Sequence, residues 1–248
     1  MTELESLTAE SGAGRNVLKR AAAEAAVELV EDGMVVGLGT GSTAAFAIEA
    51  LARRHKQGLR FIGIATSERT AAQATAAGIL LTTFHQHREI DLTIDGADEV
   101  ERATLNLIKG LGGALLREKI VAAASRRRAI IVDGNKLVDR LGERTPVPVE
   151  VVAFGLEVTQ ARLGMLGATA RLRLSATGEP IVTDSGNRIL DCSFGLIPDP
   201  GRLEGEIKRI VGVVESGLFI GLADVVFAAD NTGVHRLDRA VRGSDLTK

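Results

Sequence analysis

Short apolar segments alternate with helical segments along the first part of the chain, and this alternation limits the fold more than any other feature. Apolar side chains recur at helical spacing in residues 16–31, 43–54, 67–77 and 113–125. Short apolar runs, typical of strands, lie at residues 34–39, 59–65, 79–84, 89–95 and 129–134. Strands that alternate with helices of this length predict an α/β fold, with a mostly parallel sheet covered on both faces.

The pattern changes at residues 145–152, where two prolines interrupt an apolar run. A helix over 156–166, a half-buried strand over 168–174, a hairpin over 181–194 and a helix over 201–211 are predicted next. These elements indicate a small α+β domain at 147–212. Residues 213–221 and 223–229 predict further strands, the last of which could rejoin the main sheet. We therefore expect 1–146 and 213–248 to form one domain together.

The composition excludes several classes of protein. The 248 residues carry a formal net charge of -2, so there is no electrostatic footprint for nucleic acid or an anionic membrane. Basic clusters at 53–56 and 126–128 follow helical patterns and are expected to be solvated at helix ends. Only 3% of the residues are aromatic, which argues against base stacking.

The chain has one cysteine, Cys192, which excludes an intramolecular disulfide and offers no zinc site. No apolar run is long enough to cross a bilayer, and the first residues lack a basic, apolar signal pattern. A cytoplasmic protein is therefore expected.

A glycine-rich turn, Gly37-Leu38-Gly39-Thr40-Gly41-Ser42-Thr43, joins a predicted strand to a predicted helix. Its spacing misses the third glycine of the dinucleotide fingerprint, and no lysine precedes the Ser-Thr pair as in a Walker loop. Glycines allow backbone to approach a ligand, and a helix N-terminus offers free N–H groups. The turn predicts a phosphate site; a tight turn with a capped helix is the alternative.

Three carboxylates end the strand over 89–95, at Asp95-Gly96-Ala97-Asp98-Glu99. Open α/β sheets place ligands where their strands end. A catalytic or hydroxyl-binding role is the favoured interpretation. A magnesium site and solvated loop acids are the alternatives.

Lys109-Gly110-Leu111-Gly112-Gly113 follows and leads into a helix that contains Glu118. The neighbours of Glu118 at i−4, i−3, i+3 and i+4 are all apolar: Ala114, Leu115, Val121 and Ala122. Burial among apolar side chains disfavours the charged carboxylate and raises its basicity, as a general base requires. A structural, paired Glu118 is the alternative.

Asp133-Gly134-Asn135-Lys136 also follows an apolar strand. Lys136 could supply a positive charge for a phosphate, and a simple turn is an equal alternative. His85 and His87 are given no role.

Taken together, these segments resemble the type A family of ribose-5-phosphate isomerases. The resemblance rests on these stretches, in this order: GLGTGSTAAFAIEAL, TSERT, IDGADEV, IKGLGGALLREKI, IVDGNK, PVPVEVV, VTDSGNRILD and GLFIGLADVVF. It covers nearly the whole chain from about Lys19, and the DGADE and KGxGG…REK blocks are its specific part.

The resemblance implies a Rossmann-like α/β/α domain with a small α+β lid domain. It also implies interconversion of ribose 5-phosphate and ribulose 5-phosphate in the pentose phosphate pathway, without cofactor or metal, by a homo-oligomer. Glu118 matches the proton acceptor. The substrate loops match Thr40 to Thr43, Asp95 to Asp98 (with Gly96 and Ala97) and Lys109 to Gly112, and lysines of the substrate site match Lys136 and Lys19.

Within this scheme Lys109 and the glycine-loop N–H groups stabilise an oxyanion, Asp95 and Asp98 hold sugar hydroxyls, and Asp95 assists proton transfer. Glu99 is expected to be structural. The chain departs from the family pattern at Leu111, where a glycine is usual, and at DGNK, where a serine hydroxyl is lost. A sugar-phosphate deaminase or lactonase, and a non-catalytic sugar-phosphate regulator, are the competing functions.

Overall fold

The computed structural model describes residues 3–240, with side chains described from Gly14 onward. The helices are α1 (Glu3–Val27), α2 (Ser42–Lys56), α3 (Glu68–Ala76), α4 (Leu115–Ala123), α5 (Leu156–Met165) and α6 (Pro200–Lys208), with a 3-10 turn at η1 (Gly134–Lys136). The helix predicted to start at residue 16 therefore begins earlier, at Glu3. Helix α3 begins where the sequence predicts, because the Ser67 hydroxyl accepts a hydrogen bond from Thr70 N.

The main sheet has six strands in the order β14-β13-β6-β3-β1-β2. Its members are β1 (Val35–Leu38), β2 (Ile62–Ala65), β3 (Ile90–Gly96), β6 (Ser125–Asp133), β13 (Val225–Asp230) and β14 (Gly233–Asp238). All neighbouring pairs are parallel except β13 with β14. The predicted mostly parallel sheet is confirmed, and β13 does rejoin it.

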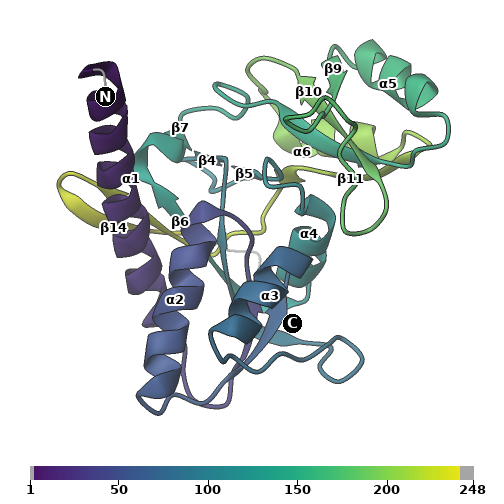
Figure 1. The fold of residues 1–248 in the computed structure, drawn as a ribbon. Helices are drawn as coiled ribbons and strands as arrows, with labels where there is room; N and C mark the ends of the chain where they lie inside the picture. The colour runs from purple at the N-terminus through teal and green to yellow at the C-terminus, as the bar shows by residue number, and fades with distance from the viewer. Residues whose placement is uncertain (1–2, 241–248) are drawn as a thin grey trace.

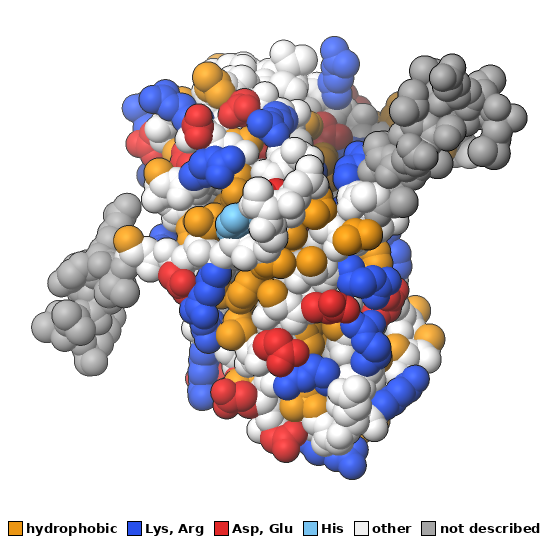
Figure 2. Space-filling model, turned by 90° about the vertical axis from the view of Figure 1, so that its left-hand side faces the viewer, with side chains coloured by type: hydrophobic (Ala, Val, Ile, Leu, Met, Phe, Trp, Pro, Cys, Tyr) orange, Lys and Arg blue, Asp and Glu red, His pale blue; other side chains and the backbone are white. Residues whose placement is uncertain are grey.

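Helices α1 and α2 cover one face of this sheet, and α4 lies against the other (Figure 1). Side chains alternate along a strand. Leu92 and Ile94 of β3 therefore belong to the core beneath α1 and α2, whereas Asp95 projects to the side where α4 carries Glu118. Figure 2 shows basic and acidic side chains interspersed over the face that carries α1 and β14, with no broad area of one charge.

A second, antiparallel sheet has the order β11-β8-β10-β9 and lies with α5 and α6 at the upper right of Figure 1. Its strands are β8 (Val147–Val151), β9 (Thr169–Leu172), β10 (Arg188–Ser193) and β11 (Val213–Ser216). The predicted small α+β unit thus has a sheet of its own. Because β11 pairs with β8, we propose that this unit extends to Ser216 rather than ending at residue 212.

A third sheet, unforeseen in the sequence, has the order β12-β5-β4-β7. It consists of β4 (Glu99–Glu101), β5 (Leu107–Ile108), β7 (Leu137–Val138) and β12 (Leu218–Phe219). Val100 and Phe219 pack on the main sheet from the side opposite α1. Ile108 and Leu218 belong to the core of the small unit, so these short strands connect the two larger sheets.

Three predictions of secondary structure are wrong. Residues 79–84 form no strand and make only an isolated bridge at Leu81. The basic cluster at 126–128 lies in β6 rather than at a helix end. The hairpin over 181–194 is replaced by pairing of β10 with β9, because residues 181–187 form a loop. In the described part of the chain, no helix has both the length and the apolar character to cross a membrane.

Candidate active site

The segments that follow β1, β3 and β6 meet at one edge of the main sheet, because parallel strands end on the same side. Together with the loop between β5 and α4 they enclose a cavity of about 300 Å³. Its walls are formed by Lys19, Thr40, Gly41, Ser42, Thr43, Arg69, Gly96, Ala97, Asp98, Lys109, Gly110, Leu111, Gly112, Glu118 and Lys136.

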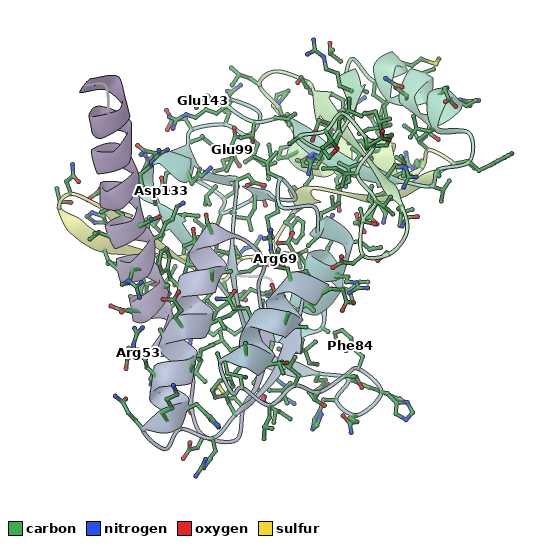
Figure 3. All side chains as sticks on the ribbon, in the orientation of Figure 1. Arg53, Arg69, Phe84, Glu99, Asp133 and Glu143 are labelled. Atoms are coloured by element: carbon green, nitrogen blue, oxygen red, sulfur yellow. The ribbon has the colours of Figure 1, made fainter. Side chains whose placement is uncertain are left out.

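All the residues predicted to bind substrate or take part in catalysis line this cavity, apart from Asp95. Asp95 lies just behind the wall and is buried. Arg69 is the one lining residue that sequence reasoning missed. It lies in the first turn of α3, near the centre of the molecule (Figure 3), and its Nη2 is 3.8 Å from where a Cβ on Gly112 would stand. The sequence did contain a sign of this role for Arg69, because the stretch TSERT that contains it also lies between a strand and a helix, like the other segments of the site.

Lys109 lies between two buried carboxylates. Its Nζ is 3.0 Å from Asp95 Oδ2 and 3.1 Å from Glu118 Oε1, and it also donates to Gly96 O at 2.6 Å. A lysine ammonium has three N–H donors, so all three are used in this state. Lys109 therefore holds the two carboxylates in place and has no donor left for a further oxygen unless one partner is released.

Burial and charge shift the pKa values of this group in a consistent way. Burial raises the pKa of Glu118 to about 8, against the opposing effect of Lys109. Burial also raises the pKa of Asp95. Burial alone would lower the pKa of Lys109, but Asp95 and Glu118 raise it by more, so it lies above its usual value. The lysine stays charged, and Glu118 can gain or lose a proton near neutral pH.

Glu118 is only 3% exposed, as the apolar stripe on α4 predicts. Its Oε1 is taken by Lys109, but its buried Oε2 has no hydrogen-bond partner among the described residues. An unsatisfied buried carboxylate oxygen is costly and is typical of a functional group. This oxygen belongs to a residue of the cavity wall, and a buried carboxylate with a free oxygen has the chemical properties that a general base requires.

Helix α2 directs its N-terminus at the cavity. Its N-cap residue is Gly41, so no side chain caps this end of the helix in the described structure. Ser42 and Thr43 form its first turn, and Lys19 Nζ donates to Ser42 Oγ at 3.0 Å. Lys136, on η1, lines the same cavity. Free N–H groups, hydroxyls and two lysines suit a phosphate dianion.

Thr40 takes part in a buried hydroxyl cluster. Its Oγ1 lies 2.7 Å from Thr66 Oγ1, 2.8 Å from Ser67 Oγ and 3.0 Å from Thr70 Oγ1. Its backbone N–H donates to Asp95 Oδ1 at 3.1 Å. The polar groups of Thr40 thus hold the loop in place, although the residue borders the cavity.

Gly39 has no side chain, and this leaves the space that the Asp95 carboxylate occupies. A Cβ at this position would lie 2.1 Å from Asp95 Oδ1, far inside any tolerable contact.

The other acidic residues of the DGADE segment accept hydrogen bonds from backbone N–H groups, as Asp95 does. Asp98 Oδ2 accepts from Leu111 N at 2.9 Å. Glu99 is fully buried and accepts three N–H groups of the segment 142–145, as expected of a structural residue.

Comparison with known proteins identifies the family of this chain. The sequence model described as Ribose 5-phosphate isomerase A (phosphoriboisomerase A) matches residues 62–233. A ribose-5-phosphate isomerase A of Gloeobacter violaceus is 60% identical over 222 residues, which are 90% of this chain and 96% of that protein. The chain belongs to the ribose 5-phosphate isomerase A family.

Further relatives of this family agree in sequence and in structure. A ribose-5-phosphate isomerase A of Gluconobacter oxydans is 57% identical, over 90% of this chain and 97% of that protein. The ribose 5-phosphate isomerase A structure from Methanocaldococcus jannaschii superimposes with a TM-score of 0.86 at 43% identity, covering 90% of this chain and 98% of that one. A D-ribose-5-phosphate isomerase solved in complex with phospho-erythronic acid has the same TM-score at 38% identity, covering 90% and 98%. The fold expected from the resemblance to ribose 5-phosphate isomerase A is therefore confirmed.

Proposed function

We propose that this chain interconverts D-ribose 5-phosphate and D-ribulose 5-phosphate, an aldose–ketose isomerisation of the non-oxidative pentose phosphate pathway. One observation carries the proposal: Glu118 presents an unpaired, buried carboxylate oxygen at the cavity, with Lys109 beside it. Relatives named ribose-5-phosphate isomerase A, at 57 to 60% identity over nine-tenths of the chain, support it.

In this mechanism the Glu118 carboxylate removes the proton from C2 of the open-chain aldose. The electron pair forms the C1–C2 double bond, and negative charge develops on O1. The proton of the C2 hydroxyl passes to O1, and Glu118 returns its proton to C1, which gives the ketose. The charge of Lys109, next to Glu118, favours the enediolate electrostatically.

The remaining residues bind and orient the substrate. The N-terminus of α2, with Ser42, Thr43, Lys19 and Lys136, anchors the phosphate. A phosphate held away from the reacting carbons fixes their position relative to Glu118, so that binding energy is used for orientation. In this proposal Thr40 and the loops 95–98 and 109–112 contact the sugar.

Asp95 has an additional role in the free protein. Its oxygens accept from Thr40 N, from Gly96 N and from the Lys109 ammonium. It thereby keeps Lys109 in position beside Glu118. The contact of Asp95 with sugar hydroxyls, and that of Asp98, stay predictions.

A coupled assay of ribulose 5-phosphate formation tests the function, with Glu118→Gln as the decisive variant. We expect turnover to be abolished while ribose 5-phosphate still binds, because the amide keeps the size of the side chain but cannot accept the carbon proton. Glu49→Gln, in an exposed ion pair with Arg20, is the matched control and should retain activity. Turnover near the normal rate in Glu118→Gln would exclude Glu118 as the base.

The same preparation discriminates the other functions. A deaminase would release ammonia from an amino sugar phosphate, and a lactonase would open a sugar lactone. A regulator would bind sugar phosphate without converting it. A chelator should leave the rate unchanged; no cluster of three or more potential metal ligands occurs among the described residues.

We further propose that the chain works as a homo-oligomer in the cytoplasm. Large apolar side chains are exposed on the small unit: Phe154 at 95%, Val211 at 94% and Val158 at 63%. Contiguous exposed apolar surface is typical of an interface. Light scattering after size-exclusion chromatography should give at least twice the 26.1 kDa of one chain. A monomer at micromolar concentration would refute the oligomer, and cell fractionation tests the location.

A further inference from the structure

Arg173 connects the small unit to the wall of the cavity. It directly follows β9, and its side chain is only 10% exposed. Its Nη1 donates to Gly110 O at 2.7 Å and to Leu111 O at 3.1 Å. Its Nε donates to Asp191 Oδ2 at 2.9 Å, and its Nη2 donates to Asp191 Oδ1. A guanidinium held by both oxygens of a carboxylate is fixed in orientation, so the two carbonyls meet a rigid donor.

This contact determines where the loop N–H groups point. In a trans peptide the C=O and the following N–H point in opposite directions, and no cis peptide occurs in the described chain. With Gly110 O turned toward Arg173, the N–H of Leu111 must point away, and it does, since Asp98 accepts it at 2.9 Å. The same rule applies to the next peptide. Leu111 O faces Arg173, so the N–H of Gly112 points to the opposite side.

The N–H of Gly112 is available to a ligand. Gly112 lines the cavity, and its N–H has no acceptor within the described residues. The three donors of Lys109 are already used by Asp95, Glu118 and Gly96 O. An oxyanion that develops in the cavity thus finds a free backbone donor here without disturbing Lys109.

We propose that Arg173 is a positioning residue for catalysis, which with Asp191 fixes the glycine loop so that the N–H of Gly112 donates to the enediolate oxyanion. This inference rests on the proposed isomerase function. The cation next to the carbonyls of Gly110 and Leu111 also polarises these amides, which strengthens their N–H groups as donors. The small unit is thereby part of the catalytic machinery although it supplies no residue that touches the reacting carbons.

The test compares Arg173→Met and Arg173→Lys with the control Arg171→Met, which replaces an exposed arginine on β9, two residues before Arg173. We measure kcat and KM for ribose 5-phosphate, binding of phospho-erythronic acid by calorimetry, and thermal unfolding. The carboxylate of this aldonic acid resembles the enediolate, so it reports on the oxyanion donor separately from turnover.

For Arg173→Met we expect kcat to fall about 10- to 100-fold, somewhat less than the effect of removing an oxyanion donor outright. KM should stay within about threefold, and phospho-erythronic acid should bind more weakly by a factor similar to the loss in kcat. Arg173→Lys keeps the positive charge but loses the paired hydrogen bonds to both oxygens of Asp191, so its kcat should lie between those of Arg173→Met and the unmodified protein. The control should match the unmodified protein.

Three results would overturn the inference: an unchanged kcat with raised KM, unchanged binding of phospho-erythronic acid, or a kcat loss explained by the fraction of unfolded protein. An unmodified protein that binds phospho-erythronic acid but does not isomerise ribose 5-phosphate would refute the proposed function instead. In that case Arg173→Met must still weaken binding of the aldonic acid, or the inference about Arg173 fails as well.

Discussion

Glu118 makes the stability of the protein depend on pH in a way that one substitution should remove. Its pKa is raised from the ordinary 4.5 to about 8 in the folded state. The folded protein therefore holds this proton more tightly than the unfolded chain does. The resulting stabilisation is fully present below pH 4.5 and is lost progressively as the pH rises to 8. Each pKa unit corresponds to about 1.4 kcal/mol, so the loss attributable to Glu118 is on the order of 5 kcal/mol.

Glu118→Gln replaces the neutral carboxylic acid by an amide of nearly the same shape that does not titrate. Urea unfolding at a series of pH values from 4.5 to 9 gives the free energy of unfolding of both proteins. The difference, variant minus unmodified, should become more positive by about 4 to 5 kcal/mol across this range. The contribution of Asp95 cancels to first order, because it is present in both proteins.

The matched control is Glu49→Gln, whose side chain is 47% exposed and paired with Arg20. An exposed ion pair contributes less than about 1 kcal/mol to stability. The free energy of unfolding of Glu49→Gln should therefore change with pH as that of the unmodified protein does. If the free energies of unfolding of Glu118→Gln and the unmodified protein run parallel from pH 4.5 to 9, the pKa of Glu118 is not raised by burial. The physical basis for its role as a base would then be lost.

Three other outcomes follow from the same structure. The value of kcat/KM should rise with pH through an apparent pKa of about 8, because the free enzyme must lose the Glu118 proton to act as a base, and a flat profile from pH 6 to 9 would contradict this. Gly39→Ala should destabilise the protein by about 3 kcal/mol or more in urea unfolding, since its Cβ would overlap Asp95. Lys119→Met should cost about 1.5 to 3 kcal/mol, measured in the same way, because Glu204 loses its hydrogen bond to Lys119 and Glu215 keeps only Lys208 as a cationic partner.

Local patterns were sufficient for those parts of the site that depend on chain neighbours. Strand ends and helix starts are encoded by residues next to one another, so the turns after β1, β3 and β6 could be located in the sequence. Glu118 was identified because its environment on α4 is made by residues three and four positions away. Burial of Glu118 in the folded protein, at 3% exposure, agrees with that reasoning.

Tertiary contacts were beyond the same reasoning. Residues 79–84 read as a strand, but they find only one bridging partner at the sheet edge. The cluster 126–128 directly follows a helical segment in the sequence, yet it lies in β6, because β3 pairs with this part of the chain. The third sheet is made of two- and three-residue strands, too short for any periodicity. Nothing in the sequence around Arg173 indicates its contact with the glycine loop, because its partners Asp191 and Gly110 lie some twenty and sixty residues away.

The leucine of the KGLGG loop can be understood from the same contacts. Glycine is required at Gly110, where φ is +109°, but Leu111 is not among the described residues with positive φ. An L-residue is therefore accommodated at 111 without strain. Both polar backbone groups of Leu111 are engaged, the N–H by Asp98 and the carbonyl by Arg173, and its side chain is 42% exposed beside the cavity. The departure from the usual glycine thus leaves the direction of the Gly112 N–H intact and changes only the apolar surface that a substrate meets on entering.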